Sequence, residues 1–493
     1  MILIAFVLVV ACAIALIAFS RNHRQMNLVC IGEALIFLGL AGWLILTGQI
    51  PVSTFLVGSQ FFFIDHLGIY EILVTTVIFL LAAIYARGYV EGLLDSGELG
   101  RNSLRLFYAA WALLLLIITL AFCSDNLALF WIFAELTTIL SAMLIAILAA
   151  RENIDAAIKY IFIASISMLF SFVGLIFLFE VSRTALGEGT LNWTSLMQHA
   201  SVLPAGMLIA AFALVFTGFA AKSGIFPFHT WLPEAHAKAP SAVSAILSGV
   251  LLNVGIYGII RVYAIVHQTT AAAAAAPLLA IFGILTVGIA AISMLPERNL
   301  KKLIAFSSIE NMGILLIGLA VSTPLAIFWM LFHIMAHSFT KASLFFSAGI
   351  LHRQYRSTLS ADAVDEIRDV FRLQPLAAWG IIIGGLAIIG MPPSPVFFSK
   401  FFILLQLGTV SLPALAILLV LLFIASVALG YYVISTFTQV SSEERPLETR
   451  QYHTPASMKI PIVALLILIV LLGIIFTSGE TSFFNQIVTE LRF

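Results

Sequence analysis

Long apolar segments constrain the fold of this chain more than any other feature of its sequence. A helix needs about 20 predominantly apolar residues to cross the hydrocarbon core of a bilayer. Fourteen segments of helical length meet this requirement in a chain of 493 residues that is 62% hydrophobic and only 10% charged. The sequence therefore predicts an all-α polytopic protein of the lipid bilayer, with about 14 transmembrane helices. The approximate segments are residues 2–20, 27–47, 62–86, 104–123, 126–149, 157–181, 203–231, 242–266, 274–295, 301–321, 324–350, 375–407, 411–438 and 459–478.

Positive charge is distributed unevenly between the loops. Most of the 24 Lys and Arg residues lie in alternate loops on one side of the predicted bundle, whereas the opposite side carries only Arg183 and Arg492. Positively charged loops remain in the cytoplasm. We therefore expect a multi-pass protein of a prokaryotic cytoplasmic (inner) membrane, with both termini on the outer, periplasmic side. The formal net charge of zero gives no reason to expect a nucleic-acid partner.

The seventh and twelfth spans each combine a buried lysine with prolines that break the helix. Proline removes a backbone hydrogen bond, which a bilayer tolerates only where the freed groups face protein or a polar cavity. A lysine at mid-membrane depth is costly and normally marks a path for ions or protons. This combination is typical of a transport site. The residues are Lys222, Pro227 and Pro233 in the seventh span, and Pro392, Pro393, Pro395 and Lys400 in the twelfth.

The broken spans are an odd number of spans apart, so they have opposite orientations in the membrane. The sequence thus predicts two inverted five-helix repeats, made of spans 4–8 and spans 9–13, with broken helices 7 and 12. The predicted units are transmembrane helices 1–3 (residues 1–103), a first repeat (104–268), a second, inverted repeat (269–440) and a C-terminal helix 14 (441–493).

Further ionisable residues lie at mid-membrane depth in other spans. Glu135 is about ten residues from the outer end of the fifth span, and therefore about 15 Å deep. In the eleventh span His333, His337 and Lys341 recur every four residues and so share one helix face. Groups at one depth on several helices are too costly to be packing accidents. Because carboxylate, lysine and imidazole all exchange protons, these residues and the two buried lysines predict a proton relay.

Each of these residues also has a structural explanation when it is taken alone. Glu135 can pair with a neighbouring cation and tie two helices together, whereas Glu33 and Glu71 lie nearer the ends of their spans, where local pairing is expected. The two histidines of the eleventh span have the spacing of a metal pair, but no third ligand accompanies them, so no metal site is predicted. Lone histidines are more often structural. The residues considered for a relay or supporting role are Lys159, His229, His236, Asn253 and Glu310.

Three stretches of the sequence resemble the antiporter-like subunits of respiratory complex I. They are Ser124-Asp-Asn-Leu with Glu135, Lys222-Ser-Gly-Ile-Phe-Pro-Phe-His-Thr-Trp-Leu-Pro-Glu-Ala-His236, and Leu300-Lys-Lys-Leu-Ile-Ala-Phe-Ser-Ser. That superfamily also contains subunits of Mrp cation/proton antiporters and membrane subunits of group 4 nickel–iron hydrogenases. Within it, the segment Ser308-Ile-Glu310-Asn311-Met-Gly is most similar to component F of hydrogenase-4 type complexes.

This resemblance implies roles for the buried residues. Glu135 matches the essential glutamate of the fifth helix and Lys222 the lysine of the seventh helix. His337 and Lys341 match the polar group of the eleventh helix, and Lys400 matches the terminal lysine of the twelfth. In the family these groups form a central hydrophilic axis that carries protons between half-channels.

The eighth span departs from the family pattern at Asn253, where some relatives place a lysine. An amide can hydrogen-bond to water but does not exchange a proton at neutral pH. The link between Lys222 and the second half of the axis would then depend on water or on the histidines of the eleventh span.

The resemblance implies a non-redox, proton-translocating subunit of an oxidoreductase of the hydrogenase-4 or complex I type. No cofactor is expected in this chain. Fe–S clusters and a Ni–Fe site, or quinone, are expected in partners, which would be other membrane subunits and peripheral Fe–S or hydrogenase-like subunits on the cytoplasmic side. In the expected mechanism Glu135 sets the charge state of Lys222, whose proton passes along the eleventh span and then through Lys400. The alternatives are a subunit of an Mrp-type sodium/proton antiporter and a structural membrane-arm subunit with an inactive channel.

Overall fold

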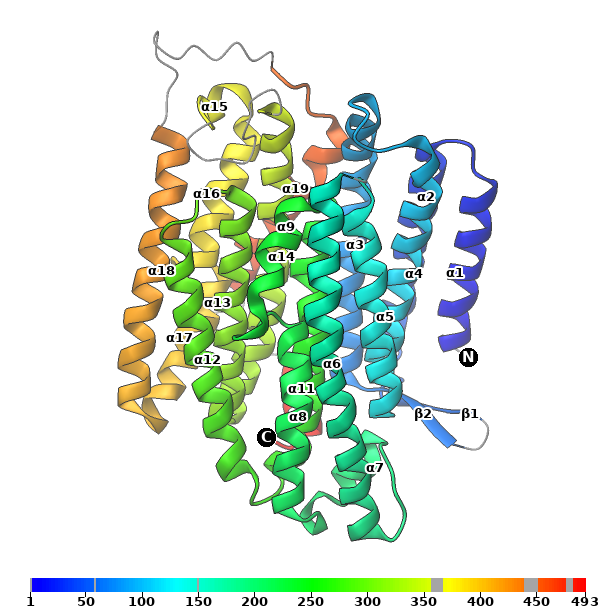
Figure 1. Cartoon of the computed structure of the whole chain (residues 1–493), viewed down its shortest axis with the longest axis vertical. Coiled ribbons are helices and arrows are strands. Elements are labelled where there is room, and N and C mark those ends of the chain that lie inside the picture. Colours follow the sequence, from blue (N-terminus) through cyan, green and yellow to red (C-terminus); the bar gives the residue numbers. More distant parts are fainter. Residues whose placement is uncertain (1, 57–58, 149, 356–366, 439–450, 476–481) are drawn as a thin grey trace.

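The computed structural model describes residues 2–56, 59–148, 150–355, 367–438, 451–475 and 482–493. Within these residues the chain forms a bundle of long helices with one two-stranded sheet (Figure 1). Thirteen of the described helices are long and apolar enough to cross a membrane. Two shorter apolar helices, α16 (Pro375–Ile389) and α17 (Pro395–Val410), follow one another at the position of the predicted twelfth span. The predicted all-α polytopic architecture is therefore confirmed.

The long helices follow the predicted order of spans. Before the first predicted repeat they are α1 (Ile2–Phe19), α2 (His23–Leu46) and α3 (His66–Asp95). Those of the first repeat are α4 (Leu104–Phe122), α5 (Leu127–Ala146), α6 (Arg151–Leu186), α8 (Ala205–Lys222), and a span made of α10 (Ser241–Ile246), the π-helix η4 (Leu247–Leu251) and α11 (Leu252–His267). The remaining ones are α12 (Ala272–Met294), α13 (Leu300–Val321), α14 (Pro324–Gln354), α18 (Leu412–Thr438) and α19 (Ala456–Ile475).

Short helices connect or extend these spans. They are η1 (Arg101–Ser103), α7 (Trp193–Gln198), η2 (Ala200–Val202), η3 (Phe228–Thr230), α9 (Trp231–Lys238), α15 (Val370–Leu373) and α20 (Ser482–Glu490). In Figure 1, α15 lies at the upper end of the bundle and α7 at the lower end. The β-hairpin and the C-terminus lie toward the same lower end as α7.

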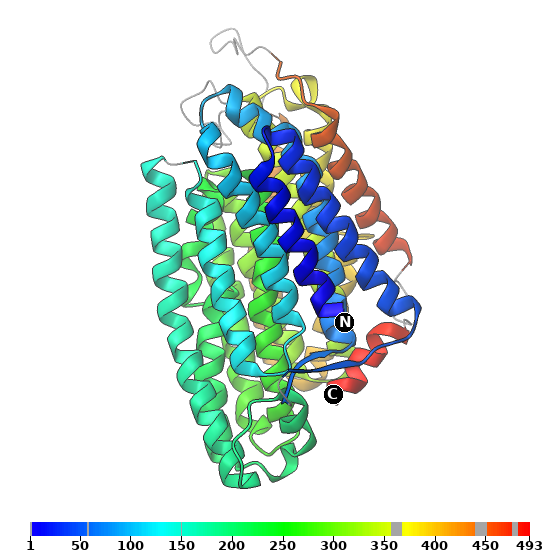
Figure 2. The ribbon, with the colours of Figure 1, turned by 90° about the vertical axis from the view of Figure 1, so that its right-hand side faces the viewer.

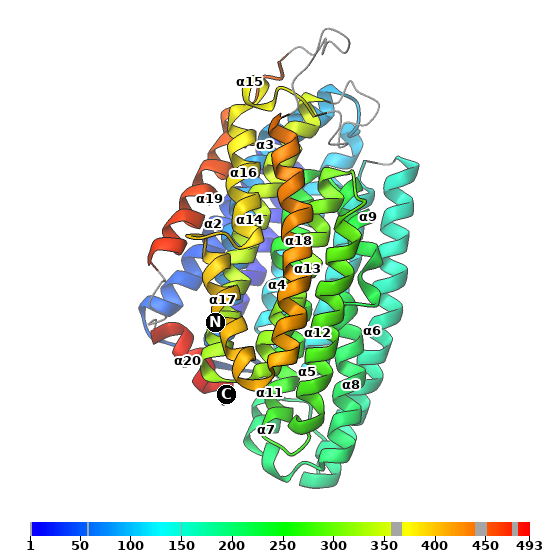
Figure 3. The ribbon, with the colours of Figure 1, turned by 90° about the vertical axis from the view of Figure 1, so that its left-hand side faces the viewer.

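The centre of the bundle is formed by α14, α13 and the α10–α11 span. Nearly all side chains of these segments are buried, which fits their apolar character all round the helix rather than on one face. In contrast, α1, α2, α18 and α19 bury only a third or less of their residues. Figure 2 shows α1 and α2 on one side of the bundle, and Figure 3 shows α18 on another side. These exposed faces are the ones expected to contact lipid or other membrane subunits.

Capping residues explain where three of the functionally important helices begin. Asn126 precedes α5 and accepts a hydrogen bond from the Leu129 backbone N–H (3.2 Å). Thr323 caps α14 and Ser394 caps α17 in the same way, and a proline follows each of these two caps. A polar N-cap satisfies a backbone N–H that has no partner in the helix, and proline at the first helical position removes no helical hydrogen bond.

The prediction that the third span begins near residue 62 is wrong. The strands β1 (Val52–Leu56) and β2 (Ser59–Ile64) form an antiparallel hairpin, with Val52 opposite Ile64. The helix α3 begins only at His66, and the side chain of Asp65 caps it. Only Asp65 and His66 separate the apolar residues 61–64 from the apolar part of α3, and such a short run does not distinguish a strand from a helix start.

Candidate functional site

The first helix break consists of a glycine turn and a short second helix. The helix α8 ends at Lys222, Gly224 adopts a left-handed conformation (φ +67°), and the chain becomes helical again at α9. Glycine suits this turn because it has no Cβ atom. The Trp231 indole N–H donates a hydrogen bond to the Ala221 carbonyl oxygen (3.0 Å). This carbonyl therefore stays partnered within the protein although the helix has ended.

Lys222 is buried, with 1% of its surface exposed. Its ammonium group donates a hydrogen bond to Thr138 Oγ1 on α5 (2.6 Å) and lies 6.0 Å from the centre of the Tyr160 ring on α6. Both partners are neutral. A buried ammonium whose direct contacts are neutral is energetically costly, as expected of a functional group in a membrane.

Glu135 lies on α5, three residues before Thr138. It is half-buried and accepts a short hydrogen bond from Ser165 Oγ on α6, while its Oε2 atom is buried without a hydrogen-bond partner. Between these two described side chains, Glu135 and Lys222, there is no direct ion pair, but the carboxylate is close enough to interact electrostatically with the ammonium. The two groups therefore share one polar region between α5, α6 and α8 without touching.

The second helix break carries a lysine that is paired. The helix α16 ends before Gly390, which is left-handed (φ +93°), and α17 starts after Ser394. Lys400 donates a hydrogen bond to Glu310 Oε1 on α13 (2.7 Å) and another to the Ile388 carbonyl oxygen (2.9 Å). The lysine thus satisfies a carbonyl group near the end of α16. Glu310, predicted as a possible relay or supporting residue, is the direct ionic partner of Lys400.

The histidines and the lysine predicted on one face of the eleventh span are all fully buried on α14. His333 Nδ1 hydrogen-bonds to Ser399 Oγ (2.7 Å), next to Lys400 in the chain. The His333 and His337 rings are stacked with centroids 6.4 Å apart. Lys341 donates to the Ile304 carbonyl oxygen (2.7 Å) and to a serine hydroxyl, both on α13. The ladder therefore extends along α14 and ends beside Lys400.

Asn253 occupies a junction between three elements. Its Nδ2 atom lies within hydrogen-bond distance of three acceptors, which its two hydrogens share: the Gly249 carbonyl oxygen in η4 (3.2 Å), Ser338 Oγ on α14 (3.2 Å) and Glu71 Oε2 on α3 (3.4 Å). The expected local pairing of Glu71 is thus replaced by a contact with a distant helix. Local pairing of Glu33 is not seen either, because both of its carboxylate oxygens are buried without a hydrogen-bond partner.

The other candidate residues are placed differently. The His236 ring stacks on Phe345 with centroids 4.6 Å apart, and both of its nitrogens are buried without hydrogen-bond partners. His229 is buried in η3 with an unpartnered Nδ1 atom. Lys159 is exposed and lines a cavity of about 500 Å³ where α6 and α13 begin and α9 ends. Acidic and basic residues alternate around this cavity, including Glu152, Asp155, Glu234, Lys238 and Lys302.

A buried ion pair between Arg261 and Asp65, called the charged lock below, lies at the end of the bundle where α3 and α5 begin. Arg261 on α11 donates two hydrogen bonds to the Asp65 carboxylate (2.6 and 2.7 Å), and its guanidinium stacks against Trp193. Asp125, just before α5, accepts hydrogen bonds from the backbone N–H (3.0 Å) and the hydroxyl (2.8 Å) of Thr194. Burial raises the pKa of Asp125 above its ordinary value, although these two hydrogen bonds oppose the shift.

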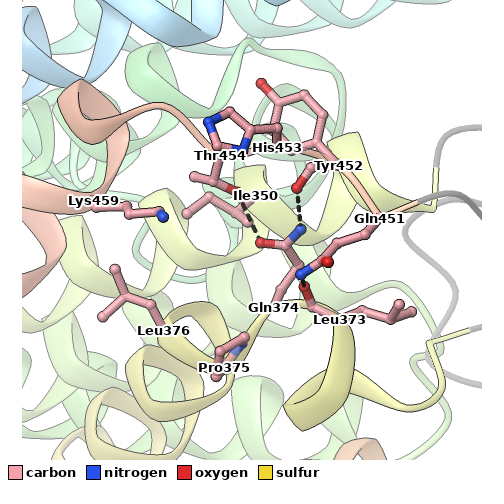
Figure 4. A pocket seen from close by; sticks show the side chains of 10 residues that line it. All are labelled: Ile350, Leu373, Gln374, Pro375, Leu376, Gln451, Tyr452, His453, Thr454 and Lys459. Atoms are coloured by element: carbon pink, nitrogen blue, oxygen red, sulfur yellow. Dashed lines mark hydrogen bonds between the residues drawn. The ribbon is translucent and has the colours of Figure 1, made fainter.

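A separate cavity of about 260 Å³ lies where α14 ends and α16 and α19 begin (Figure 4). Gln374 donates hydrogen bonds to Gln354 Oε1 (2.8 Å) and to the Tyr452 carbonyl oxygen (2.7 Å), and it accepts one from Thr454 (2.8 Å). These contacts fasten the chain that enters α19 to the rest of the bundle. None of the predicted relay residues lines this cavity.

Comparison with known proteins identifies the family. A family model described as "NADH:quinone oxidoreductase/Mrp antiporter, TM" matches residues 124–427. This chain belongs to that family. It is 34% identical over 348 residues to the hydrogenase-4 component F homolog of Methylacidiphilum infernorum, with 70% of this chain and 72% of the relative covered. The predicted resemblance to antiporter-like membrane subunits is therefore confirmed.

Two further similarities describe the range of the antiporter family. The chain is 26% identical to a subunit of the Na(+)/H(+) antiporter of Alkalihalophilus pseudofirmus, with 74% of this chain and 72% of the relative covered. A chain of the membrane-bound sulfane sulfur reductase, an archaeal respiratory membrane complex, has the same fold with a TM-score of 0.86. That match covers 99% of this chain and 96% of the other at 22% identity.

The structure brings together more groups than the sequence predicted. The contacts Glu310–Lys400 and Glu71–Asn253 join residues that are far apart in the sequence, and only the depth of each residue in its span hinted at them. Within the described part of the chain, no group of three or more His, Cys, Asp or Glu side chains is arranged to hold a metal ion.

Proposed function

We propose that this antiporter-like subunit translocates protons as part of a redox-driven membrane complex. The observation that carries the proposal is the pair of buried lysines at two helix breaks, Lys222 and Lys400, with a fully buried histidine ladder on α14. Ionisable groups in a membrane are retained where they carry ions or protons. Proton transfer would follow Glu135, Lys222, the residues His333, His337 and Lys341 of α14, and Lys400.

The proposed first step is a change in the contact between Glu135 and Lys222. A carboxylate near a buried ammonium favours the charged form of the lysine. When Glu135 turns toward Lys222, the lysine would take up a proton, and when Glu135 returns to Ser165, the lysine would release it toward α14. Buried polar atoms usually have hydrogen-bond partners, including ordered water. Water at the unpartnered nitrogens of His236 and His337 would therefore extend the path between these groups.

The charged cavity beside Lys159 is the proposed entry for protons. Lys238 is paired with Glu152, and Lys302 is paired with Glu234 (2.6 Å). The wall of the cavity therefore carries proton-exchanging groups of both signs. By the charge distribution of the loops, this end of the bundle would face the cytoplasm, and both termini would lie on the outer side of the inner membrane.

The driving energy would come from partner subunits. Relatives of this chain include a hydrogenase-4 component F homolog, and a chain of a respiratory membrane complex shares its fold. We accordingly propose that other membrane subunits adjoin this chain and that peripheral subunits on the cytoplasmic side carry Fe–S clusters and a Ni–Fe site, or react with quinone. Exposed apolar faces of α1, α2, α18 and α19 would accommodate neighbouring membrane subunits.

A second candidate function is a subunit of an Mrp-type sodium/proton antiporter. The observation in its favour is the similarity to a subunit of a Na(+)/H(+) antiporter over 74% of the chain. Both functions require the same buried lysines. They differ in the energy source, which is a redox reaction in the first case and an ion gradient in the second.

Purification and transport measurements on the native complex separate these functions. The complex is isolated through a tag on this chain, its subunits are identified by mass spectrometry, and it is reconstituted into liposomes that contain a pH-sensitive dye. Co-purified Fe–S proteins and proton uptake that depends on redox turnover are expected. If only membrane subunits co-purify, and an imposed Na⁺ gradient drives proton movement, the result would instead support the antiporter function. If protons move under neither condition, the result would support the remaining alternative, a structural subunit with an inactive channel.

A further inference from the structure

A buried carboxyl group that the proposed axis does not use lies on α3 and contacts α11. Glu71 on α3 is only 1% exposed, and its Oε2 atom accepts a hydrogen bond from Asn253 Nδ2 at 3.4 Å. The other oxygen, Oε1, is buried without a hydrogen-bond partner. An ionisable group in the membrane interior is costly and is rarely kept without a function.

Asn253 links this carboxyl group to the histidine ladder. The same amide nitrogen that contacts Glu71 also donates a hydrogen bond to Ser338 Oγ at 3.2 Å. Ser338 directly follows His337 on α14, and neither ring nitrogen of His337 has a hydrogen-bond partner. The hydrogen-bonded chain from Glu71 therefore ends on α14 at the residue that follows His337, whose imidazole has no hydrogen-bond partner.

The first half of the axis meets the same junction from the other side. Ser223, which directly follows Lys222, donates a hydrogen bond to the Leu252 carbonyl oxygen (3.1 Å). Leu252 directly precedes Asn253. The end of α8 is thus fixed against the turn of α11 that carries Asn253, so the hydrogen bonds of Ser223 and Asn253 connect the ends of α8 and α3 to α14 through α11.

Close packing holds α3 at this position. The Tyr70 hydroxyl, next to Glu71, donates a hydrogen bond to the Leu331 carbonyl oxygen of α14 (2.6 Å). In η4, a Cβ atom added to Gly249 would lie 2.8 Å from Ile78 Cδ1 on α3 and 3.2 Å from the Ser338 carbonyl oxygen. Only glycine lets the π-helix approach both neighbours so closely. These contacts hold α3, and with it Glu71, against α14 and η4.

The charged lock limits where a proton on Glu71 can go. Asp65 lies six residues before Glu71 on the way to the nearer end of the bundle and is held by two hydrogen bonds from Arg261. Arginine does not lose its proton in proteins. The lock therefore holds the Asp65 carboxylate in an ion pair, with both of its oxygens engaged by Arg261.

We propose that Glu71 is a proton-carrying residue of the axis and replaces the ionisable side chain that α11 lacks at Asn253. The Lys222 ammonium loses a proton, which neutralises the Glu71 carboxylate, and Glu71 later loses it to the His337 imidazole. Each transfer breaks one N–H or O–H bond and forms another, without electron transfer. The Asn253 amide orients the carboxylate. This inference rests on the proposed proton-translocating function.

Transport by the reconstituted native complex tests the role of Glu71. Glu71→Gln keeps an acceptor for the Asn253 amide but removes the exchangeable proton, and it is expected to lower proton transport per turnover by about a hundredfold. The matched control is Glu33→Gln, which neutralises a buried carboxyl group outside the axis and should leave transport unchanged. Adding Asn253→Lys to Glu71→Gln places an ionisable group on α11, and recovery of transport would support the inference.

Infrared difference spectroscopy provides a readout that does not depend on transport. A pH jump should change a carboxyl C=O band that is present in the wild-type complex and in Glu33→Gln but absent in Glu71→Gln. If the band does not depend on Glu71, or if Glu71→Gln transports protons like the wild type, the inference is overturned and the proposed function still stands. A wild-type complex that moves no protons would overturn the proposed function instead.

Discussion

The two halves of the bundle hold the same pair of residue types in two different arrangements. In the first half, Glu135 on α5 and Lys222 on α8 share a polar region without direct contact. In the second half, Glu310 on α13 and Lys400 on α17 form a buried ion pair at 2.7 Å. In each half the acid lies on the second span of the predicted five-span unit, and the lysine lies beside the helix break.

This difference would give the proposed proton transfer along the axis a direction. A carboxylate in contact with a buried ammonium stabilises its charge more than a neutral hydroxyl does. Lys400 therefore has a charged partner in contact, whereas Lys222 would gain one only if the Glu135 carboxylate moved toward it. We infer that transport is driven by a neighbouring protein of the complex that acts on the first half, because only there can a small side-chain movement create or remove an ion pair.

The largest expected effect is on transport through the first half. Lys222→Met keeps the length of the side chain but removes the proton carrier, and proton transport per turnover should fall by about a hundredfold or more. The measurement is dye-detected proton uptake by the reconstituted complex. Lys459→Met is the control, because Lys459 lies exposed at the start of α19, outside the axis. Unchanged transport in Lys222→Met would contradict this comparison of the two halves, because it would show that the first half does not depend on Lys222.

The next largest effect is on stability, and it should be confined to the second half. Lys400→Met leaves the Glu310 carboxylate buried and unpaired, which is expected to cost about 3–5 kcal/mol of unfolding free energy. Glu135→Gln removes no ion pair and should cost about 1 kcal/mol. Titration of the solubilised complex with a denaturing detergent measures both.

A double substitution tests whether the pair itself causes that loss. Glu310→Gln combined with Lys400→Met removes both charges and should recover much of the stability lost in Lys400→Met alone. Equal losses in the single and double variants would show that the two side chains do not act as a pair.

The smallest effect concerns the neutral partner of Lys222. Thr138→Val deletes the hydroxyl that accepts the hydrogen bond from the ammonium and should cost about 1–3 kcal/mol, since a buried charged donor loses its partner. Transport should fall while the second half is unaffected. Thr138→Ser retains the hydroxyl and is expected to behave like the wild type. A wild-type transport rate in Thr138→Val would show that Lys222 relies on another partner.

The sequence predicts those parts of the structure that depend on local composition. Apolar length defines the spans, and the prolines near Lys222 and Lys400 locate both helix breaks, because a membrane imposes the same backbone requirement on every segment. The histidine ladder follows from the four-residue spacing on one helix. The hairpin before α3 is missed because its second strand is as apolar as the helix that follows.

Contacts between distant residues are beyond what the sequence predicts. Glu310 and Lys400 are 90 positions apart, and Glu71 and Asn253 are 182 positions apart. Depth in the membrane is readable from position within a span, whereas the direction in which each side chain points depends on how the helices pack. The predicted partner of Lys222, Glu135, is at the right depth, but its carboxylate hydrogen-bonds to α6.

The π-helix η4 also determines where this chain can tolerate a change in length. A π-turn contains more residues than an α-helical turn, so deleting one residue within Leu247–Leu251 can be absorbed as ordinary α-helix. A deletion in α11, outside the π-helix, would rotate every later residue of the helix by about 100°. It would turn Asn253 or Arg261 away from its acidic partner on α3. Natural length variation in this span is therefore expected to concentrate in these five residues.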